Sequence, residues 1–168
     1  MSGKRRWLAV GAVGLVALVL WSRLGSEERA LAEVLVRASA ALSARSGEDD
    51  GSRARRLEHE LPDFFTSDVR VEAPELFSGS GRAEVARAAV ALARGRHPIL
   101  ALSGLALKID DRGHASATFR VSASESQAGD LHARTRNARA SLVKTDRGWR
   151  IEWVVVENET PAEPEPRP

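Results

Sequence analysis

Ala115-Ser116-Ala117-Thr118-Phe119-Arg120-Val121-Ser122-Ala123 is the stretch that decides the fold of this 168-residue chain. Small or apolar residues occupy its odd positions, and polar residues occupy its even positions. Successive side chains of a β-strand point to opposite faces of a sheet, so this period of two predicts a strand with one buried face. We therefore expect a sheet whose neighbouring strands follow the same rule.

The segments on either side of this strand carry the same period. Leu105, Leu107 and Ile109 alternate before a turn at 110–113, and a strand from Ala133 to Lys144 follows a polar hairpin tip at 124–130. After a second turn at 145–148, the last strand directs four residues inward: Trp149, Ile151, Trp153 and Val155. The second half of the chain is thus predicted to be a run of hairpin-connected strands.

The first half of the chain is predicted to be mostly helical. Apolar residues recur at helical spacing from Leu31 to Leu42, after Ser26 as a helix cap. Shorter helices are expected at about 53–61 and 82–94, with a short strand at 69–72 between them. Helices followed by hairpins indicate an α+β fold, with helices packed on one face of an antiparallel sheet.

The N-terminus predicts the location of the protein. Lys4-Arg5-Arg6 precedes 15 uncharged residues, Trp7 through Trp21. Flanking cations stay on the cytoplasmic side, so this pattern predicts a single-pass anchor with its N-terminus in the cytoplasm. A cleaved signal peptide is the alternative, but no small-x-small site follows in register. We expect a stub and transmembrane anchor at 1–25, an extracytoplasmic domain at 26–157 and a disordered Pro/Glu tail at 158–168.

The charge of the predicted domain excludes one class of partner. Lys4, Arg5, Arg6 and Arg23 belong to the anchor and account for four of the 25 cations, which leaves 21 against 23 acids. The domain is therefore nearly neutral, and it has no basic stripe interleaved with aromatic residues, so we expect no nucleic-acid binding. The chain has no cysteine.

The order of these elements resembles a known superfamily. It is similar to the nuclear-transport-factor-2-like superfamily in three segments, which follow one another in the same order. They are Phe64-Phe65-Thr66-Ser67-Asp68-Val69-Arg70-Val71, then Ser80-Gly81-Arg82 opening a helix, and then Lys144-Thr145-Asp146-Arg147-Gly148-Trp149-Arg150-Ile151. Ketosteroid isomerases and polyketide cyclases are among its members. The resemblance covers roughly 27–157 and implies a strongly curved, cystatin-like sheet that wraps a helix and leaves a conical, mostly apolar pocket.

The resemblance also locates the residues for proton transfer, and this chain lacks them. The superfamily's carboxylate base corresponds to Ala73, its oxyanion-hole tyrosine to Ala38 and its oxyanion aspartate to Ala140. An alanine cannot exchange a proton, and the chain has no tyrosine. We therefore expect no catalysis of this kind. No histidine pair has metal-ligand spacing and no phosphate loop is present, so we expect neither a metal nor a cofactor.

The resemblance and the strand phases together suggest pocket residues. Arg134 and Arg136 share the phase of Ala138 and Ala140, which places them near the wide mouth, where Glu125 could meet one of them. They could hold an anionic group at the rim of the pocket, or form a solvated ion pair of little energetic value. The full set of pocket candidates is Phe65, Leu107, Phe119, Arg134, Arg136, Trp149 and Trp153.

These observations predict a membrane-anchored, non-catalytic interaction domain. We expect it in the inner (cell) membrane with its domain in the periplasm, as an accessory or assembly component of an envelope complex. A homodimer or an envelope protein is the expected partner. The alternative is a small-molecule-binding domain, or an isomerase- or cyclase-like enzyme, that uses the conical pocket.

Overall fold

The protein is an α+β domain, as predicted. The computed structural model describes residues 25–74, 76–94, 98–127 and 130–157, with the backbone alone at 125–127 and 130–133. The described elements are, in chain order, α2 (Ser26–Leu42), α3 (Asp50–Glu60), the 3₁₀ turn η1 (Leu61–Asp63), β1 (Phe65–Ala73), β2 (Phe77–Ser80), α4 (Arg82–Ala93), β3 (Ile99–Ile109), β4 (His114–Gln127), β5 (Asp130–Thr145) and β6 (Gly148–Val156).

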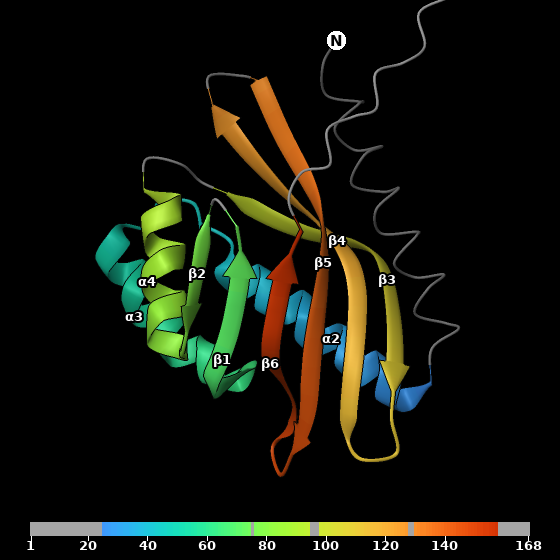
Figure 1. Cartoon of the computed structure of the whole chain (residues 1–168). Helices are drawn as coiled ribbons and strands as arrows, with labels where there is room; N and C mark the ends of the chain where they lie inside the picture. Colours follow the sequence, from blue (N-terminus) through green and yellow to red (C-terminus); the bar gives the residue numbers. More distant parts are fainter. Residues whose placement is uncertain (1–24, 75, 95–97, 128–129, 158–168) are drawn as a thin grey trace, which may run out of the picture.

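The six strands form one sheet in the order β2-β1-β6-β5-β4-β3 (Figure 1). Strands β3 to β6 are joined by antiparallel hairpins, and the turns at 110–113 and 145–148 lie where they were predicted. β1 and β6, however, are parallel, so the sheet is mixed and the prediction of an antiparallel sheet is wrong at this pair. A parallel pair requires a long crossover, which here includes α4 and four further strands.

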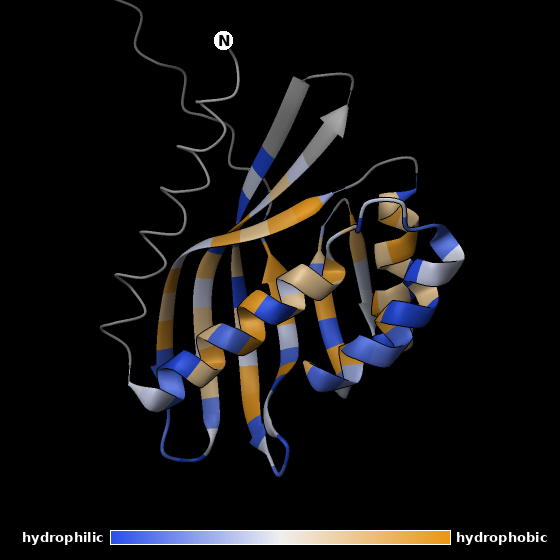
Figure 2. Cartoon of the chain, turned by 180° about the vertical axis from the view of Figure 1, so that it is seen from behind, coloured by the Kyte–Doolittle hydropathy of each residue, from blue (hydrophilic) through white to orange (hydrophobic). Residues whose placement is uncertain are grey.

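The two faces of the sheet differ in their cover. The inner face lies against α2 and presents Ala115, Ala117, Phe119, Ala138, Ala140 and Leu142, all buried. The outer face, on the other side of the same strands, presents Ser116, Thr118, Arg120, Arg139 and Ser141, and none of the described helices covers it (Figure 1). Figure 2 shows α2 lying across the sheet, with hydrophobic stretches on the helix and on the strands behind it.

Helix starts depend on side chains that bind free backbone N–H groups. Glu28 accepts a hydrogen bond from Gly25 N at 2.8 Å, so Gly25 is the N-cap of α2 in place of the predicted Ser26. Asp49 accepts from Ser52 N at 2.8 Å, which starts α3 three residues earlier than predicted. Gly81, at φ 85°, is the N-cap of α4.

Two parts of the sheet were not predicted. β2 pairs with β1 over Phe77–Ser80, where the sequence predicted no strand. The expected hairpin tip at 124–130 is mostly strand, because β4 and β5 remain paired up to Gln127 and Asp130. This end of the hairpin projects beyond the other strands in Figure 1, so neither of its faces needs apolar residues.

The predicted anchor and tail lie outside the described residues, apart from Gly25. Among the helices that the structure describes, none has the length and apolar character required to cross a bilayer.

Candidate functional site

A cavity lies between α2 and the inner face of the sheet. Its volume is about 170 Å³, and the side chains around it present no polar surface. Ser39 also borders the cavity, but its hydroxyl donates to Val36 O at 2.8 Å. The lining residues come from α2, α4 and five of the strands: Leu35, Ala38, Ser39, Leu42, Phe65, Val71, Val85, Leu100, Leu102, Phe119, Val121, Ala138, Ile151, Val154 and Val156.

Three buried alanines lie on α2, β5 and β1, which are elements that line this cavity. Ala38 of α2 lines the cavity directly. Ala140 pairs with Val154 on the inner face, and Ala73 ends β1 opposite Phe77. All three are nearly inaccessible to solvent, and a methyl group can neither donate nor accept a proton.

Arg136 marks one end of the inner face. It pairs with Val121 across β4 and β5, and it lies two residues before Ala138, the partner of Val156. Its Nη1 donates to Pro74 O at 3.4 Å, so its side chain reaches past the end of β6 to the loop after β1. Arg136 is only 9% exposed, whereas Arg134 is exposed to solvent. The side chain of Glu125, the predicted partner, is outside the described residues.

The fold can be compared with known structures at this point. No family model and no curated protein sequence matches the chain. Solved structures do match. Aln2 from a Streptomyces species is 20% identical with a TM-score of 0.62, over 81% of this chain and 94% of its own. An NTF2-like protein with a cystatin-like fold from Novosphingobium aromaticivorans is 16% identical with a TM-score of 0.63, over 86% of this chain and 91% of its own.

The chain has an NTF2-like, cystatin-like fold. A protein of unknown function from Nostoc punctiforme supports the same conclusion, with 14% identity, a TM-score of 0.61 and coverage of 84% of this chain and 96% of its own. Identities this low show the fold alone. The fold that the resemblance implied is thus confirmed. Any activity of this NTF2-like domain has to be argued from its own residues.

The predicted pocket residues are divided among several environments. Phe65 and Phe119 line the cavity. Leu107 packs against the hydrophobic core and does not line the cavity. Trp149 is buried on the inner face, with the ammonium of Lys144 5.8 Å from its ring centroid, and Lys144 also pairs with Glu27 at the start of α2.

Trp153 and Val155 lie on the outer face, so the prediction that they face inward is wrong. Ile151 pairs with Leu142 and Trp153 pairs with Ser141, which makes Glu152 an extra residue in β6. A β-bulge of this kind shifts the phase of the strand, so that Val154 and not Trp153 lines the cavity. The indole is 37% exposed, and its Nε1 donates to Glu72 Oε1 at 3.2 Å.

A largely buried ion-pair cluster joins α2 to α3. Glu48 accepts from Arg56 Nε at 2.6 Å and from Nη2 at 2.8 Å, and Arg56 also donates to Ala41 O at 2.6 Å. These hydrogen bonds lower the pKa of Glu48 and raise the pKa of Arg56. Arg53 donates to Leu42 O at 2.5 Å, and burial lowers the pKa of Arg53. The cluster binds carbonyls at the end of α2, which is a structural role.

The available signal for this cluster was the i,i+3 spacing of Arg53 and Arg56, which places both guanidinium groups on one side of α3. Nothing in the sequence showed that this side is buried. Within the described parts of the chain, no group of three or more His, Asp or Glu side chains gathers as a metal site would require.

Two surface hollows complete the list of candidate sites. One, of about 910 Å³, lies between α3 and α4 and is lined by small apolar residues with Arg82, Arg87 and Arg94 among them. The other, of about 440 Å³, lies on the outer face around Gly104, Arg120, Asn137 and Arg139, where Arg139 pairs with Glu157 at 3.4 Å. Both are surface features, and neither contains a described acid–base pair suited to catalysis.

Proposed function

We propose that this protein is a single-pass, membrane-anchored extracytoplasmic protein whose NTF2-like domain is non-catalytic and associates with a second copy of itself through the outer face. The dimer would serve as an accessory or assembly component of an envelope complex. The observation that carries the proposal is the exposed Trp153 on a sheet face without a described cover.

The composition of the outer face supports self-association. Trp153 and Val155 lie near its middle, with hydroxyl residues beside them on β5 and β4. Charges of both signs surround this centre: Arg70, Glu72, Arg120, Arg139 and Glu157. An aromatic anchor within a polar rim is typical of protein interfaces, and mixed charges allow the same surface to pair with itself across a two-fold axis.

The absence of proton-transfer groups supports the non-catalytic part of the proposal. The residues lining the cavity include no acid, no base and no histidine among those that the structure describes. The positions of the superfamily's catalytic groups are Ala38, Ala73 and Ala140. General acid–base catalysis needs a titratable group within hydrogen-bond reach of the substrate, and these positions supply none.

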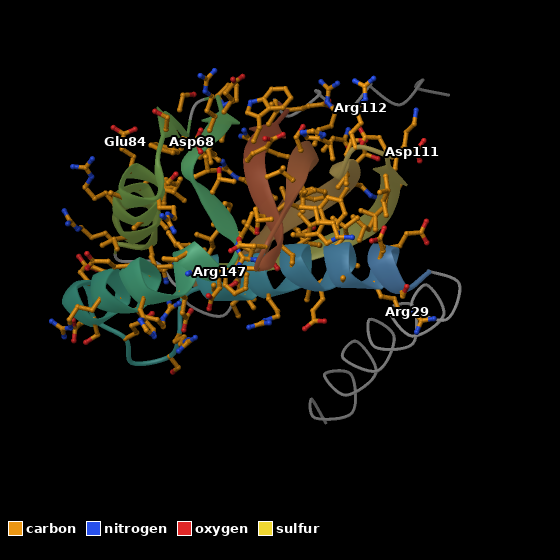
Figure 3. All side chains as sticks on the ribbon, turned by 90° about the horizontal axis from the view of Figure 1, so that it is seen from below. Arg29, Asp68, Glu84, Asp111, Arg112 and Arg147 are labelled. Atoms are coloured by element: carbon orange, nitrogen blue, oxygen red, sulfur yellow. The ribbon has the colours of Figure 1, made fainter. Side chains whose placement is uncertain are left out.

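The position of α2 indicates which end would face a membrane. α2 begins at Ser26, directly after the predicted anchor, and the β3–β4 and β5–β6 turns lie at the same end of the molecule (Figure 1). This end faces the viewer in Figure 3, where Arg29, Arg112 and Arg147 are labelled. Asp111, next to Arg112 in the β3–β4 turn, is labelled there as well, so the orientation is inferred from the start of α2 and not from the charge of this end.

Cysteine cross-linking tests the interface, because the chain has no cysteine of its own. Ser141→Cys, beside Trp153, should give a dimer in full-length protein treated with a short bis-maleimide. Trp153→Ala should weaken that dimer by about 2 kcal/mol, near thirtyfold, as an anchor residue does. Leu92→Ala, which removes an exposed side chain of α4, is the matched control and should leave the yield unchanged. Equal cross-linking from Ser67→Cys, on the exposed start of β1, would reject the outer face as the interface.

Single cysteines also test the topology. In intact cells with a permeabilised outer membrane, a membrane-impermeant maleimide should label Ser46→Cys in the α2–α3 loop and should not label Ser2→Cys. Labelling of both or of neither variant before lysis, or of Ser2→Cys alone, would refute a single-pass anchor with a cytoplasmic N-terminus.

A second candidate function is small-molecule binding in the inner cavity. The specific observation in its favour is the combination of an apolar cavity of about 170 Å³ with the buried Arg136 at one end of the same sheet face. Titration of the full-length protein with small ring compounds tests it, and a protein that binds none of them would remove it.

A further inference from the structure

We infer that Trp153 of one copy docks in the outer-face hollow of a second copy, where its indole stacks on the guanidinium group of Arg120. The two-fold axis of the dimer repeats this contact, so each copy contributes one indole and one hollow. This inference rests on the proposed dimer and identifies the groups that join its two copies.

The hollow lies where β3 leaves its regular pairing with β4. Gly104 has a φ of 63°, and the register of the two strands shifts between Ser103 and Ala106. A glycine inside a strand often marks a place that another group approaches closely, because it has no side chain to fill the space. The hollow has a volume of about 440 Å³, which is enough for a group as large as an indole. Its lining residues are Gly104, Thr118, Phe119, Arg120, Asn137, Ala138, Arg139 and Glu157.

Arg120 provides a cation at this hollow. Its guanidinium group lies beside Gly104, where an added Cβ atom would be 3.4 Å from Nε and 3.5 Å from Nη2. Within the described parts of the chain, Arg120 has no hydrogen bond and no ion pair. Arg139, the other arginine of the hollow, already pairs with Glu157 at 3.4 Å. A planar cation without an acidic partner is suited to stacking on an aromatic ring.

Trp153 provides the aromatic ring. The residue is 37% exposed, and its Nε1 donates to Glu72 Oε1 at 3.2 Å. This hydrogen bond satisfies the one polar group of the indole and leaves its carbon surface for a partner. Contact of that surface with Arg120 combines burial of apolar area with cation–π attraction, for which tryptophan is the most favourable aromatic residue.

The positions of the indole and the hollow allow both contacts in one symmetric dimer. Trp153 pairs with Ser141, whereas Arg120 pairs with Asn137, further along β5. The centre of the hollow is therefore about 10 Å from Trp153 along the strands, and two strand spacings, about 10 Å, across them. A two-fold axis between the sheets that exchanges two such places makes the strands of the copies cross at about 90°, which is the orthogonal class of sheet packing.

The test measures dimer affinity with full-length chains in detergent. Ser46→Cys, in the exposed α2–α3 loop, carries a donor or an acceptor dye, and energy transfer between the two chains gives the dissociation constant. Trp153→Ala should weaken the homodimer about thirtyfold, and Arg120→Ala should weaken it about tenfold. Arg70→Ala, which removes an exposed arginine beside Trp153 on β1, is the matched control and should not weaken the dimer.

Mixing the two variants tests the reciprocal contact directly. A dimer of one Trp153→Ala chain and one Arg120→Ala chain keeps one complete contact, between the indole of the second chain and the hollow of the first. It should be about fivefold weaker than wild type and tighter than either variant homodimer, because only one of two equal contacts is lost. Arg120→Lys, which keeps the charge without the planar group, should weaken the homodimer less than Arg120→Ala.

The outcomes separate this contact from the dimer itself. An Arg120→Ala homodimer as tight as wild type overturns the inference and leaves the dimer in place, as stacking of Trp153 on its own symmetry mate would. A mixed dimer that is no tighter than the variant homodimers overturns it as well. A wild-type chain that stays monomeric rejects the proposed function.

Discussion

The two faces of the sheet are built from the same strands and have opposite chemistry. Along β5, Ala138, Ala140 and Leu142 are buried against α2, whereas Arg139 and Ser141 between them belong to the outer face. The inner face retains a cavity whose described lining residues include no acid, no base and no histidine. The outer face has retained the polar groups and an exposed tryptophan. On this fold, the surface suited to recognition can thus differ from the surface enclosed by the helices.

The difference has an energetic consequence that one strand can test. Leu142 is 0% exposed on the inner face, and Val143, the next residue, points to the other side and is only partly buried. Leu142→Ala should lower the free energy of unfolding by about 3 kcal/mol, because it removes a buried side chain and leaves a cavity. Val143→Ala should lower it by less than about 1 kcal/mol. Equilibrium denaturation measures both, and equal losses would show that the faces are not distinct.

The cover of the inner face depends on the Glu48 cluster, which suggests a second test. Glu48→Gln should destabilise the protein by about 2 kcal/mol at neutral pH, somewhat less than is usual for breaking a fully buried pair. Arg53 would then lose its pairing with Glu48, and Arg56 would keep only the carboxylate of Glu60, at 3.1 Å. The matched control is Glu58→Gln on the exposed side of α3, which should change stability by less than about 0.5 kcal/mol.

The same cluster predicts a direction of pH dependence. Hydrogen bonds from Arg56 place the pKa of Glu48 below its ordinary value of 4.5. The stabilisation is therefore complete above the unfolded-state pKa and is lost as the pH falls through the lower folded-state pKa. Denaturation curves should show the gap between wild type and Glu48→Gln narrowing on acidification below about pH 4.5. A gap that stays constant or widens would contradict this assignment.

Some features of the fold could be predicted because they depend on local sequence. The alternation at 115–123 determined the phase of β4 correctly, and the turns at 110–113 and 145–148 were placed correctly. Arg136 was assigned to the inner face from its phase with Ala138, and the structure places it there, with its side chain buried. These conclusions need only the period of a strand, which does not depend on the rest of the chain.

Other features could not be predicted because they depend on contacts distant in sequence. β2 has four residues and one exposed face, so it pairs only because β1 is beside it. The parallel pairing of β1 with β6 joins segments about 80 residues apart, as the Glu72–Trp153 hydrogen bond illustrates. The bulge at Glu152 leaves no mark on the pattern Trp-x-Ile-x-Trp, and the inward assignment of Trp153 failed there.

The bend of β3 offers a test of smaller effect. Gly104 lies at φ 63° where the pairing of β3 with β4 shifts register, between Ser103 and Ala106. A side chain is strained in this conformation, so Gly104→Ala should lower the free energy of unfolding by about 1–2 kcal/mol. A Cβ atom would lie 3.4 Å from Arg120 Nε, a flexible contact that adds little to this cost. Ser103→Ala, its exposed neighbour, should change stability by less than about 0.5 kcal/mol, and equal effects would remove the backbone argument.

The smallest expected effect concerns the bulge that separates the two faces in β6. Because Ile151 and Trp153 already pair with the adjacent residues Leu142 and Ser141, deletion of Glu152 should restore a regular ladder without moving Trp153 to the inner face. The cost should be less than about 1 kcal/mol, since bulges lie outside regular pairing. Iodide quenching of tryptophan fluorescence measures the exposure of Trp153, when the signal of the matching Trp153→Phe variant is subtracted. The wild type and the deletion variant should show the same accessibility of the Trp153 indole. A protected indole in the deletion variant would mean that Trp153 has turned inward, and the outer face would then lose its anchor.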